Sequence, residues 1–424
     1  MKIALISEHA SPLASPGSVD SGGQNVYVAQ VAAHLARRGH RVDVFTRRDQ
    51  PEQAPVVHLA PNLRVVHVPA GPPRFVAKEG LLSFMAEFAG HLVEHCRPAS
   101  RRYDVVHANF FMSGQVALAL KRALGLPFVI TFHALGKVRR QHQGQADGFP
   151  PERIAIEQEL VAQADRIVAE CPQDRADLVE LYAADPERVE IVPCGFDPGE
   201  LGPGGHSLRH QFGLTDDDFV VLQLGRLVPR KGIDNVIRAL AVLKREHGIA
   251  ARLLVVGGEA EQPDPRLTPE IGRLAALAER EGVRDRVIFT GRQPRHLLRD
   301  FYCTADVFVT TPWYEPFGIT PLEAMACGCP VVGAEVGGIK YSVVDAVTGF
   351  LVPPHDPAAL AGRLAVLRHN PELGRAMGRA GMRRVRAAFT WKQVVAQLHG
   401  VYAAVQAPPR LTLAAGMTAG MAAP

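Results

Sequence analysis

A chain of 424 residues with 47% hydrophobic side chains can bury two cores, so we expect two domains. The formal net charge of +4 arises from Lys and Arg residues without a dense basic block, which argues against nucleic acid as a partner. Six scattered cysteines without a Cys-x-x-Cys pair argue against a disulfide framework or a zinc site, and no apolar run reaches membrane-spanning length. We therefore expect a cytoplasmic protein, with association to an anionic membrane surface left open.

Short apolar runs alternate with helical patterns through the first half of the chain. The run at 2–7 is followed by a helical pattern at 25–38 and a second run at 41–45, the βαβ rhythm of a parallel sheet. Further strands are predicted at 63–68, 105–107, 127–132, 166–169 and 189–193.

The rhythm restarts after residues 197–218, whose Gly and Pro content and lack of periodicity indicate a linker. Strands are predicted beyond it at 219–224, 252–256, 286–289, 307–310 and 330–333, with helices at 232–246 and 269–281. We predict an α/β fold in which two doubly wound, Rossmann-like domains, 1–196 and 219–390, face one another across a cleft. Residues 391–405 are predicted to be a helix that packs back towards the N-terminal domain, and the Ala-, Pro- and Gly-rich residues 406–424 a disordered tail.

The loop at 8–24 follows the first strand, where ligands bind in open parallel sheets. It ends in Gly22 and Gly23, just before a helix, so its bare backbone N–H groups suit a phosphate or a close-packed sugar. A flexible turn is the plain alternative, but long loops in compact domains are often functional.

Two cations follow the first strand of the second half. Arg226 comes just after the strand and Lys231 lies five residues later, at the start of a helix. These positions suit the charge of a leaving diphosphate, although solvated surface side chains would give the same pattern. Upstream, the acidic run 216–218 precedes a strand and is predicted to solvate a turn rather than to bind a metal.

Two carboxylates, Glu315 and Glu323, flank a point where a loop becomes a helix. Backbone amides of Gly318, Ile319 and Thr320 could meet phosphate oxygens there, while a carboxylate accepts hydrogen bonds from adjacent hydroxyls, as carboxylates do for ribose. Combined with the two cations, this arrangement predicts a nucleotide-sugar site.

With GRLVPRKG at 225–232 and EPFGITPLE at 315–323, the chain resembles the family 4 retaining glycosyltransferases over residues 1 to about 405. The resemblance implies the GT-B fold of two facing Rossmann-like domains. An N-terminal run looks closest to the D-inositol 3-phosphate glycosyltransferases of mycothiol synthesis, and sucrose-phosphate synthases share a similar Gly-Gly loop. That run comprises Ser11-Pro12-Leu13, Pro16-Gly17, Asp20-Ser21-Gly22-Gly23 and Asn25-Val26-Tyr27.

The resemblance also implies roles for individual residues. Arg226 and Lys231 would contact the donor diphosphate, Glu323 the ribose and Glu315 the hydroxyls of the donor sugar, while His133 would lie beside that sugar. The implied catalytic set is His133, Arg226, Lys231 and Glu315. The implied donor site comprises Gly22, Gly23, Arg226, Lys231, Gly318, Ile319, Thr320 and Glu323.

The acceptor site is less well matched. In the mycothiol enzymes, Lys, Tyr, Thr and Arg hold an acceptor phosphate; Lys78 and Arg153 match this pattern, but Phe110 and Ala134 lack the two hydroxyls. Cations at 137, 139 and 140 could still help to bind a phosphate, so the acceptor stays open. The predicted acceptor site comprises Asn25, Lys78, Phe110, Ala134, Lys137 and Arg153.

We therefore predict a retaining glycosyltransferase that moves a sugar from UDP-glucose or UDP-N-acetylglucosamine to a hydroxyl of a small acceptor, with or without a phosphate. Neither a cofactor nor a metal is expected, and the resemblance suggests a homodimer. Three alternatives stay open: a lipid acceptor approached through 72–97, a nucleotide-sugar epimerase, and a non-catalytic carbohydrate-binding protein.

Overall fold

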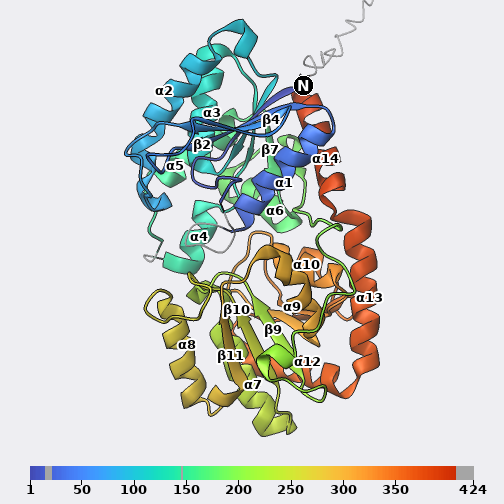
Figure 1. Ribbon diagram of the computed structural model, residues 1–424. Coiled ribbons are helices and arrows are strands. Elements are labelled where there is room, and N and C mark those ends of the chain that lie inside the picture. The colour runs from blue at the N-terminus through green and yellow to red at the C-terminus, as the bar shows by residue number, and fades with distance from the viewer. Residues whose placement is uncertain (15–21, 145–146, 407–424) are drawn as a thin grey trace, which may run out of the picture.

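The computed structural model describes residues 1–14, 22–144 and 147–406, which form two parallel-sheet domains stacked end to end (Figure 1). The blue-to-green half of the chain builds the upper domain of that view, and the green-to-orange half builds the lower one. The predicted positions 16, 17, 20 and 21 of the N-terminal loop lie outside the described residues.

The first sheet has eight strands in the order β3-β4-β2-β1-β5-β6-β7-β8, parallel except for the β3–β4 pair at one edge. The strands are β1 (Lys2–Ile6), β2 (Arg41–Arg47), β3 (Val56–Ala60), β4 (Leu63–Val68), β5 (Val105–Asn109), β6 (Phe128–Thr131), β7 (Arg166–Ala169) and β8 (Val189–Ile191).

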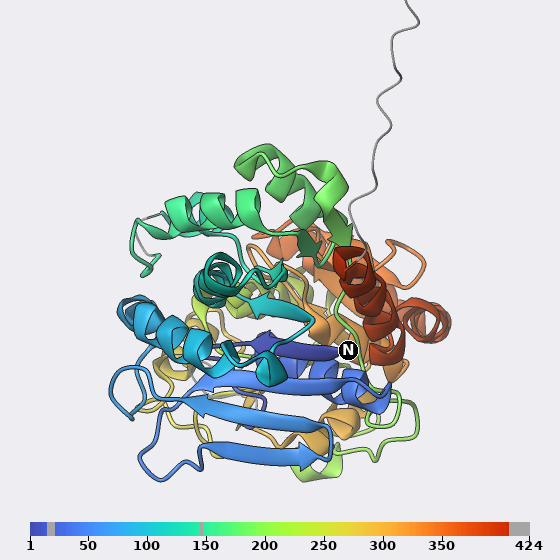
Figure 2. The ribbon, with the colours of Figure 1, turned by 90° about the horizontal axis from the view of Figure 1, so that it is seen from above.

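Alternate residues of β1 enter different cores because successive strand side chains point to opposite faces of a sheet. Ile3 and Leu5 pack with α1 (Gly23–Arg37) and α14 (Trp391–Gln406), whereas Ala4 and Ile6 pack with other helices. Those on the second face include α2 (Met85–Cys96), α3 (Phe111–Leu124), α5 (Arg153–Gln163) and α6 (Pro172–Tyr182). Figure 2 shows this layering from above, with α2 and α3 in cyan and teal beside the blue strands.

The second sheet has six parallel strands in the order β11-β10-β9-β12-β13-β14. They are β9 (Val220–Leu224), β10 (Arg252–Val256), β11 (Val287–Gly291), β12 (Val307–Thr310), β13 (Val331–Ala334) and β14 (Gly349–Val352). One face is covered by α7 (Ile233–His247), α8 (Pro269–Arg280) and α12 (Pro357–His369). The other is covered by α9 (Leu298–Thr304) and α10 (Ile319–Ala326). The remaining helices are α4 (Gly136–Gln143), α11 (Ile339–Ser342) and α13 (Pro371–Ala388).

The chain passes between the domains at two adjacent points. Phe196 N–H donates to Phe389 O at 2.9 Å, and Trp391 N–H donates to Phe196 O at 3.1 Å. A Cβ at Gly195 would lie 2.9 Å from Trp391 N, so only glycine fits where the two crossings touch. The crossings therefore form one paired connection.

Beyond this connection, α14 returns to the first domain and packs on α1 (Figure 1). Tyr402 Oη lies 2.6 Å from Nδ1 of His107 in β5, and burial lowers the pKa of His107 to about 3, which keeps the ring neutral. The helix extends through Gln406, so that residue is helical rather than the first of a tail. The rest of the predicted tail, 407–424, lies outside the described residues.

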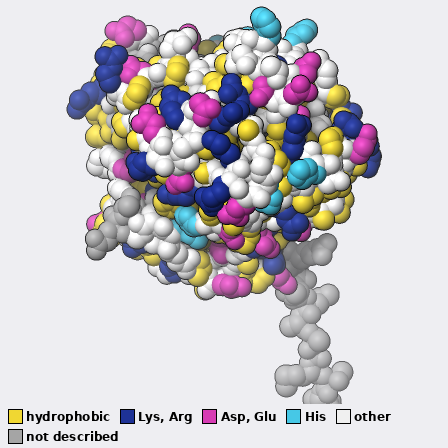
Figure 3. Space-filling model, turned by 90° about the horizontal axis from the view of Figure 1, so that it is seen from below, with side chains coloured by type: hydrophobic (Ala, Val, Ile, Leu, Met, Phe, Trp, Pro, Cys, Tyr) yellow, Lys and Arg dark blue, Asp and Glu magenta, His cyan; other side chains and the backbone are white. Residues whose placement is uncertain are grey.

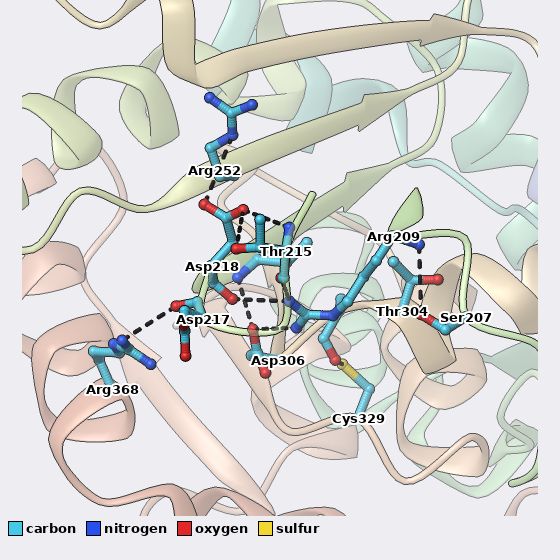
Figure 4. A network of polar contacts seen from close by, with 12 residues as sticks. Ser207, Arg209, Thr215, Asp217, Asp218, Arg252, Thr304, Asp306, Cys329 and Arg368 are labelled. Atoms are coloured by element: carbon cyan, nitrogen blue, oxygen red, sulfur yellow. Dashed lines mark hydrogen bonds and ion pairs between the residues drawn. The ribbon is translucent and has the colours of Figure 1, made fainter. Parts of the chain in front are cut away.

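The segment between β8 and β9 is bound to the second domain by Arg209 (Figure 4). Its guanidinium donates to Thr215 O at 2.7 Å and to Asp218 O at 2.9 Å, and it pairs with Asp306 at 2.9 Å. Asp218 accepts hydrogen bonds from the N–H and hydroxyl groups of Thr215 at 2.7 and 3.0 Å. Asp218, the last residue of the acidic run, therefore closes a turn before the strand.

Charges of both signs share the surface. On the end of the second domain, Lys and Arg side chains alternate with Asp and Glu side chains (Figure 3). Such mixing gives no extended field of one sign on this face. Within the described parts of the chain, no helix combines the length and apolar character that crossing a membrane requires.

Candidate active site

A cavity of about 300 Å³ lies between the two domains. Loops that leave the carboxyl ends of parallel strands line it from both sides, including those after β1 and β6 in the first domain and after β9 and β12 in the second. Open parallel sheets bind ligands at this edge. The predicted site residues that line the cavity are Gly22, Gly23, Asn25, Lys78, Phe110, His133, Ala134, Arg226, Lys231, Glu315, Gly318, Ile319, Thr320 and Glu323.

The turn before α7 holds Lys231 against the loop after β12. Gly232 has φ of +66°, and a Cβ there would lie 1.9 Å from Thr311 O, so the turn requires glycine. Lys231 Nζ lies 2.5 Å from Glu315 Oε2, and Arg230 Nη1 lies 3.5 Å from the same oxygen. Arg230 belongs to the 225–232 motif but is not among the predicted site residues.

The protonation states of this cluster follow from burial and charge together. Burial lowers the pKa of Lys231 to about 8, although the charge of Glu315 opposes that change. Burial opposes the ionisation of Glu315, but the charges of Lys231 and Arg230 outweigh it and lower the pKa of Glu315 to about 2. At neutral pH, a cation and a carboxylate therefore lie side by side on the wall of the cavity.

Helix α10 begins at the same wall. Gly318 precedes it with φ of +86°, and the N–H groups of a helix's first turn have no acceptor within the helix. Glu323 lies one turn further, 4% exposed, and accepts a hydrogen bond from Tyr302 Oη at 2.9 Å. Its second oxygen lies 3.3 Å from Arg295 Nη1, and Arg295 Nε also pairs with Glu200 at 2.7 Å. This end of α10 therefore offers N–H donors and an oriented carboxylate.

The glycine pair at the start of α1 meets the second-domain wall across the cavity. A Cβ at Gly22 would lie 3.4 Å from Arg226 Nε, and one at Gly23 would lie 3.6 Å from Ile319 Cδ1. Asn25 accepts a hydrogen bond from Gly22 N–H at 2.9 Å, so its side chain caps the helix as well as lining the cavity. Glycine here allows the two domains to approach one another.

His133 lies on the first-domain wall with both ring nitrogens engaged. Nδ1 lies 3.0 Å from Glu170 Oε1, Nε2 lies 3.1 Å from Asn109 Oδ1, and the edge of Tyr27 packs against the ring. Its backbone adopts φ of +58°, which is uncommon for a residue with a Cβ. These contacts fix the orientation of the imidazole.

Two predicted acceptor residues do not line the cavity. Lys137 Nζ donates to Leu181 O and lies 4.7 Å from the centre of the Tyr182 ring. Arg153 is 1% exposed and pairs with Glu157 at 2.7 Å. Both side chains are used inside the first domain.

Within the described residues, no group of three or more His, Cys, Asp or Glu side chains is placed to bind a metal ion. Metal independence stays a prediction, as do the roles of the individual site residues.

The two domains match two family models in turn. "Glycosyltransferase Family 4" matches residues 21–200, and "Glycosyl transferases group 1" matches residues 206–384. D-inositol 3-phosphate glycosyltransferase of Corynebacterium efficiens is 38% identical, with 95% of each chain covered. The chain belongs to the family 4 glycosyltransferases. A relative of the same name from Actinosynnema mirum is 39% identical, covering 95% of this chain and 96% of its own.

Solved structures agree with this membership. Sucrose-phosphate synthase of Thermosynechococcus elongatus matches with a TM-score of 0.87 and 32% identity, over 96% of this glycosyltransferase and 99% of that chain. The Anabaena protein HepE, in complex with UDP and glucose, matches with a TM-score of 0.75 and 22% identity, over 95% and 100% of the two chains. The GT-B fold and glycosyltransferase activity predicted from the sequence are thus confirmed.

Proposed function

We propose that this glycosyltransferase moves a hexosyl group, with retention of configuration, from UDP-glucose or UDP-N-acetylglucosamine to a hydroxyl of a small acceptor. The observation that carries the proposal is the Lys231–Glu315 pair, which shares one cavity with the start of α10 and with His133. A structural neighbour is complexed with UDP-glucose, which favours the same class of donor.

The donor side supplies the groups that a nucleoside diphosphate needs. Arg226, Lys231 and the first N–H groups of α10 can neutralise and orient its phosphate oxygens. When the Lys231 ammonium group binds a phosphate, Glu315 still has the Arg230 guanidinium as its cationic partner. The Glu315 carboxylate can then accept hydrogen bonds from sugar hydroxyls. Glu323 can then accept from the ribose.

These groups favour departure of UDP as its negative charge grows. The bond between sugar C1 and the β-phosphate oxygen breaks, with its electron pair remaining on UDP. The acceptor oxygen bonds to C1 on the same face, and its proton passes to the departing phosphate oxygen. No protein nucleophile takes part, so the side chains act by positioning and by stabilising charge.

The test is incubation of the full-length protein with each donor and a panel of small polyols, with UDP release and the anomeric configuration of the product measured by NMR. An α-linked product from an α-linked donor supports retention, and a β-linked product contradicts it. Loss of activity in EDTA that is restored by Mg²⁺ would contradict metal independence.

The alternative of a lipid acceptor depended on apolar side chains within 72–97. In the structure Leu81 and Phe84 pack with the first-domain core, and Phe75, 61% exposed, is left at the surface. One exposed ring gives little apolar area for a membrane. Co-sedimentation with anionic liposomes tests this alternative. The epimerase and non-catalytic alternatives lose support because the relatives are glycosyltransferases.

A further inference from the structure

We infer that the acceptor is an uncharged polyol, a sugar or a cyclitol without a phosphate. The inference rests on the proposed function and concerns the first-domain side of the same cavity. We call this side the acceptor end and define it by the side chains of His9, Lys78, Phe110, Ala134, Arg139 and Phe149.

Three cations lie in or directly behind the acceptor end, and each is already paired with a carboxylate of the first domain. The pairs are Lys78 with Glu79 at 3.1 Å, Arg139 with Asp147 at 2.8 Å and Arg153 with Glu157 at 2.7 Å. An acceptor phosphate would have to compete with a carboxylate at every one of them.

Arg153 is the most deeply buried of the three cations. The rings of Phe110 and Phe149 cover its guanidinium, with their centres 4.9 and 4.6 Å from Cζ. Its Nη1 atom is buried and has no hydrogen-bond partner among the residues that the structure describes, so it is closed to a ligand in this structure. One of the two cations that the family resemblance assigns to an acceptor phosphate, Arg153, is therefore enclosed.

Separating Glu157, the partner carboxylate of Arg153, from that cation would cost much free energy. Glu157 is fully buried and also accepts hydrogen bonds from Gly136 N–H at 2.9 Å and from Tyr182 Oη. A phosphate that drew Arg153 away would leave this carboxylate buried without its cation, which is strongly unfavourable. Glu157 thus already supplies the anionic partner of Arg153 that a phosphate would otherwise supply.

Further carboxylates lie close to the acceptor end. Glu170 lines the cavity beside His133, and Glu8 pairs with His9 at 2.7 Å. These groups repel an anion, whereas they accept hydrogen bonds from hydroxyls. The electrostatics of this side therefore favour an uncharged acceptor.

The walls also fit a polyol. The ring centres of Phe110 and Phe149 lie 5.6 Å apart with the ring planes at 58°, and His9 and Phe110 form a T-shaped pair with 5.2 Å between ring centres. Small-molecule sites commonly combine such aromatic walls with a few polar groups that fix orientation. The C–H face of a sugar or cyclitol can pack on the rings while its hydroxyls reach the polar groups.

The test is calorimetry on the full-length protein saturated with UDP, using matched pairs of ligands: inositol and inositol 3-phosphate, fructose and fructose 6-phosphate, and glucose and glucose 6-phosphate. We expect the best uncharged ligand to bind at least tenfold more tightly than its phosphorylated counterpart. Equal or tighter binding of the phosphorylated ligands overturns the inference, as does failure of every uncharged ligand to bind. Binding of UDP, measured first in the same sample, shows whether the donor half of the proposed function survives either result.

Two variants separate the carboxylate effect from general damage. Asp147→Asn removes the carboxylate partner of Arg139. We expect it to reduce several-fold the ratio between the Kd of a phosphorylated ligand and that of its uncharged counterpart. Glu94→Gln removes a carboxylate of α2 that is paired with Arg97, and it should leave this ratio of Kd values unchanged. A preference in Asp147→Asn equal to that of the unmodified protein counts against the inference.

Discussion

Lys231 and Glu315 form an ion pair at 2.5 Å although they are 84 residues apart in the chain. Lys231 precedes α7 in the connection after β9, and Glu315 lies in the loop after β12. Because β9 and β12 are neighbours in the second sheet, the two loops leave the same edge side by side. Sheet order therefore creates the charged wall of the cavity.

Replacing Lys231 with alanine should lower kcat by about 100-fold or more, the typical effect of losing a group that stabilises charge in the transition state. Steady-state kinetics with a UDP-sugar measures the change, and thermal unfolding shows whether the fold persists. Lys244→Ala, at the far end of α7, is the matched control and should keep full activity. A Lys231→Ala enzyme as active as the unmodified one would contradict the proposed donor site.

The pH dependence should report on the same side chain. Since burial lowers the pKa of Lys231 to about 8, kcat/KM should fall as the pH rises through that value, where the ammonium group loses its proton. The variant Lys231→Arg keeps its charge and should lack this alkaline limb. A pH profile that is unchanged in Lys231→Arg would assign the limb to another group.

The stability that Lys231 contributes should change with pH in the opposite direction. Between the folded pKa of about 8 and the ordinary value of 10.5, the unfolded chain binds a proton that the folded chain has released. Stability from this group therefore rises with pH across that window. Urea unfolding of the unmodified and Lys231→Arg proteins measures this at about pH 7.5 and about pH 9.5, which lie below and above the folded pKa of about 8. The gain in unfolding free energy at the higher pH should be present only in the unmodified protein.

Replacing Glu323 with glutamine should weaken donor binding. The side chain keeps its size but loses the charge that the ribose hydroxyls would meet, so we expect the donor KM to rise about tenfold with a smaller change in kcat. Glu270→Gln, which removes a carboxylate paired with Arg273 on α8, is the control. An unchanged donor KM in Glu323→Gln would remove Glu323 from the ribose site.

Strand positions were predictable where strands are buried on both faces. The predicted runs 166–169, 252–256 and 307–310 coincide with β7, β10 and β12, because such strands form nearly continuous apolar runs. Strand β3 was not predicted. It is an antiparallel edge strand whose Val56 and Leu59 are 37% and 49% exposed, so no buried face imposes a pattern on its sequence. Strand β14 was also missed, since its four residues begin with glycine.

For a similar reason, the residues on the second-domain wall of the cavity were easier to identify from the sequence than the contacts on the first-domain wall. Arg226, Lys231 and Glu315 lie in two short motifs whose spacing alone suggests diphosphate chemistry. The partners of Glu323 come from α9 and the turn before it. The rings that cover Arg153 come from two other parts of the chain, since Phe110 precedes α3 and Phe149 lies between α4 and α5. Pairing between distant elements is a property of the packed fold, so local sequence does not reveal it.

The contact between Gly22 and Arg226 gives a final prediction. Gly22 has φ of −159°, outside the left-handed region that favours glycine, so the restriction there is one of space. Gly22→Ala places a Cβ 3.4 Å from Arg226 Nε and should be tolerated, whereas the branched side chain of Gly22→Val must displace the guanidinium. A shift of about 1 Å in a positioning group can lower the rate about 100-fold, so Gly22→Val should lose most of its activity while unfolding at a similar temperature. The control is Gly90→Val on α2, where a Cβ meets nothing within 4 Å. It measures the effect on activity and unfolding temperature of replacing glycine by valine at a position with free space. Full activity in Gly22→Val would show that Arg226 can be displaced without affecting transfer.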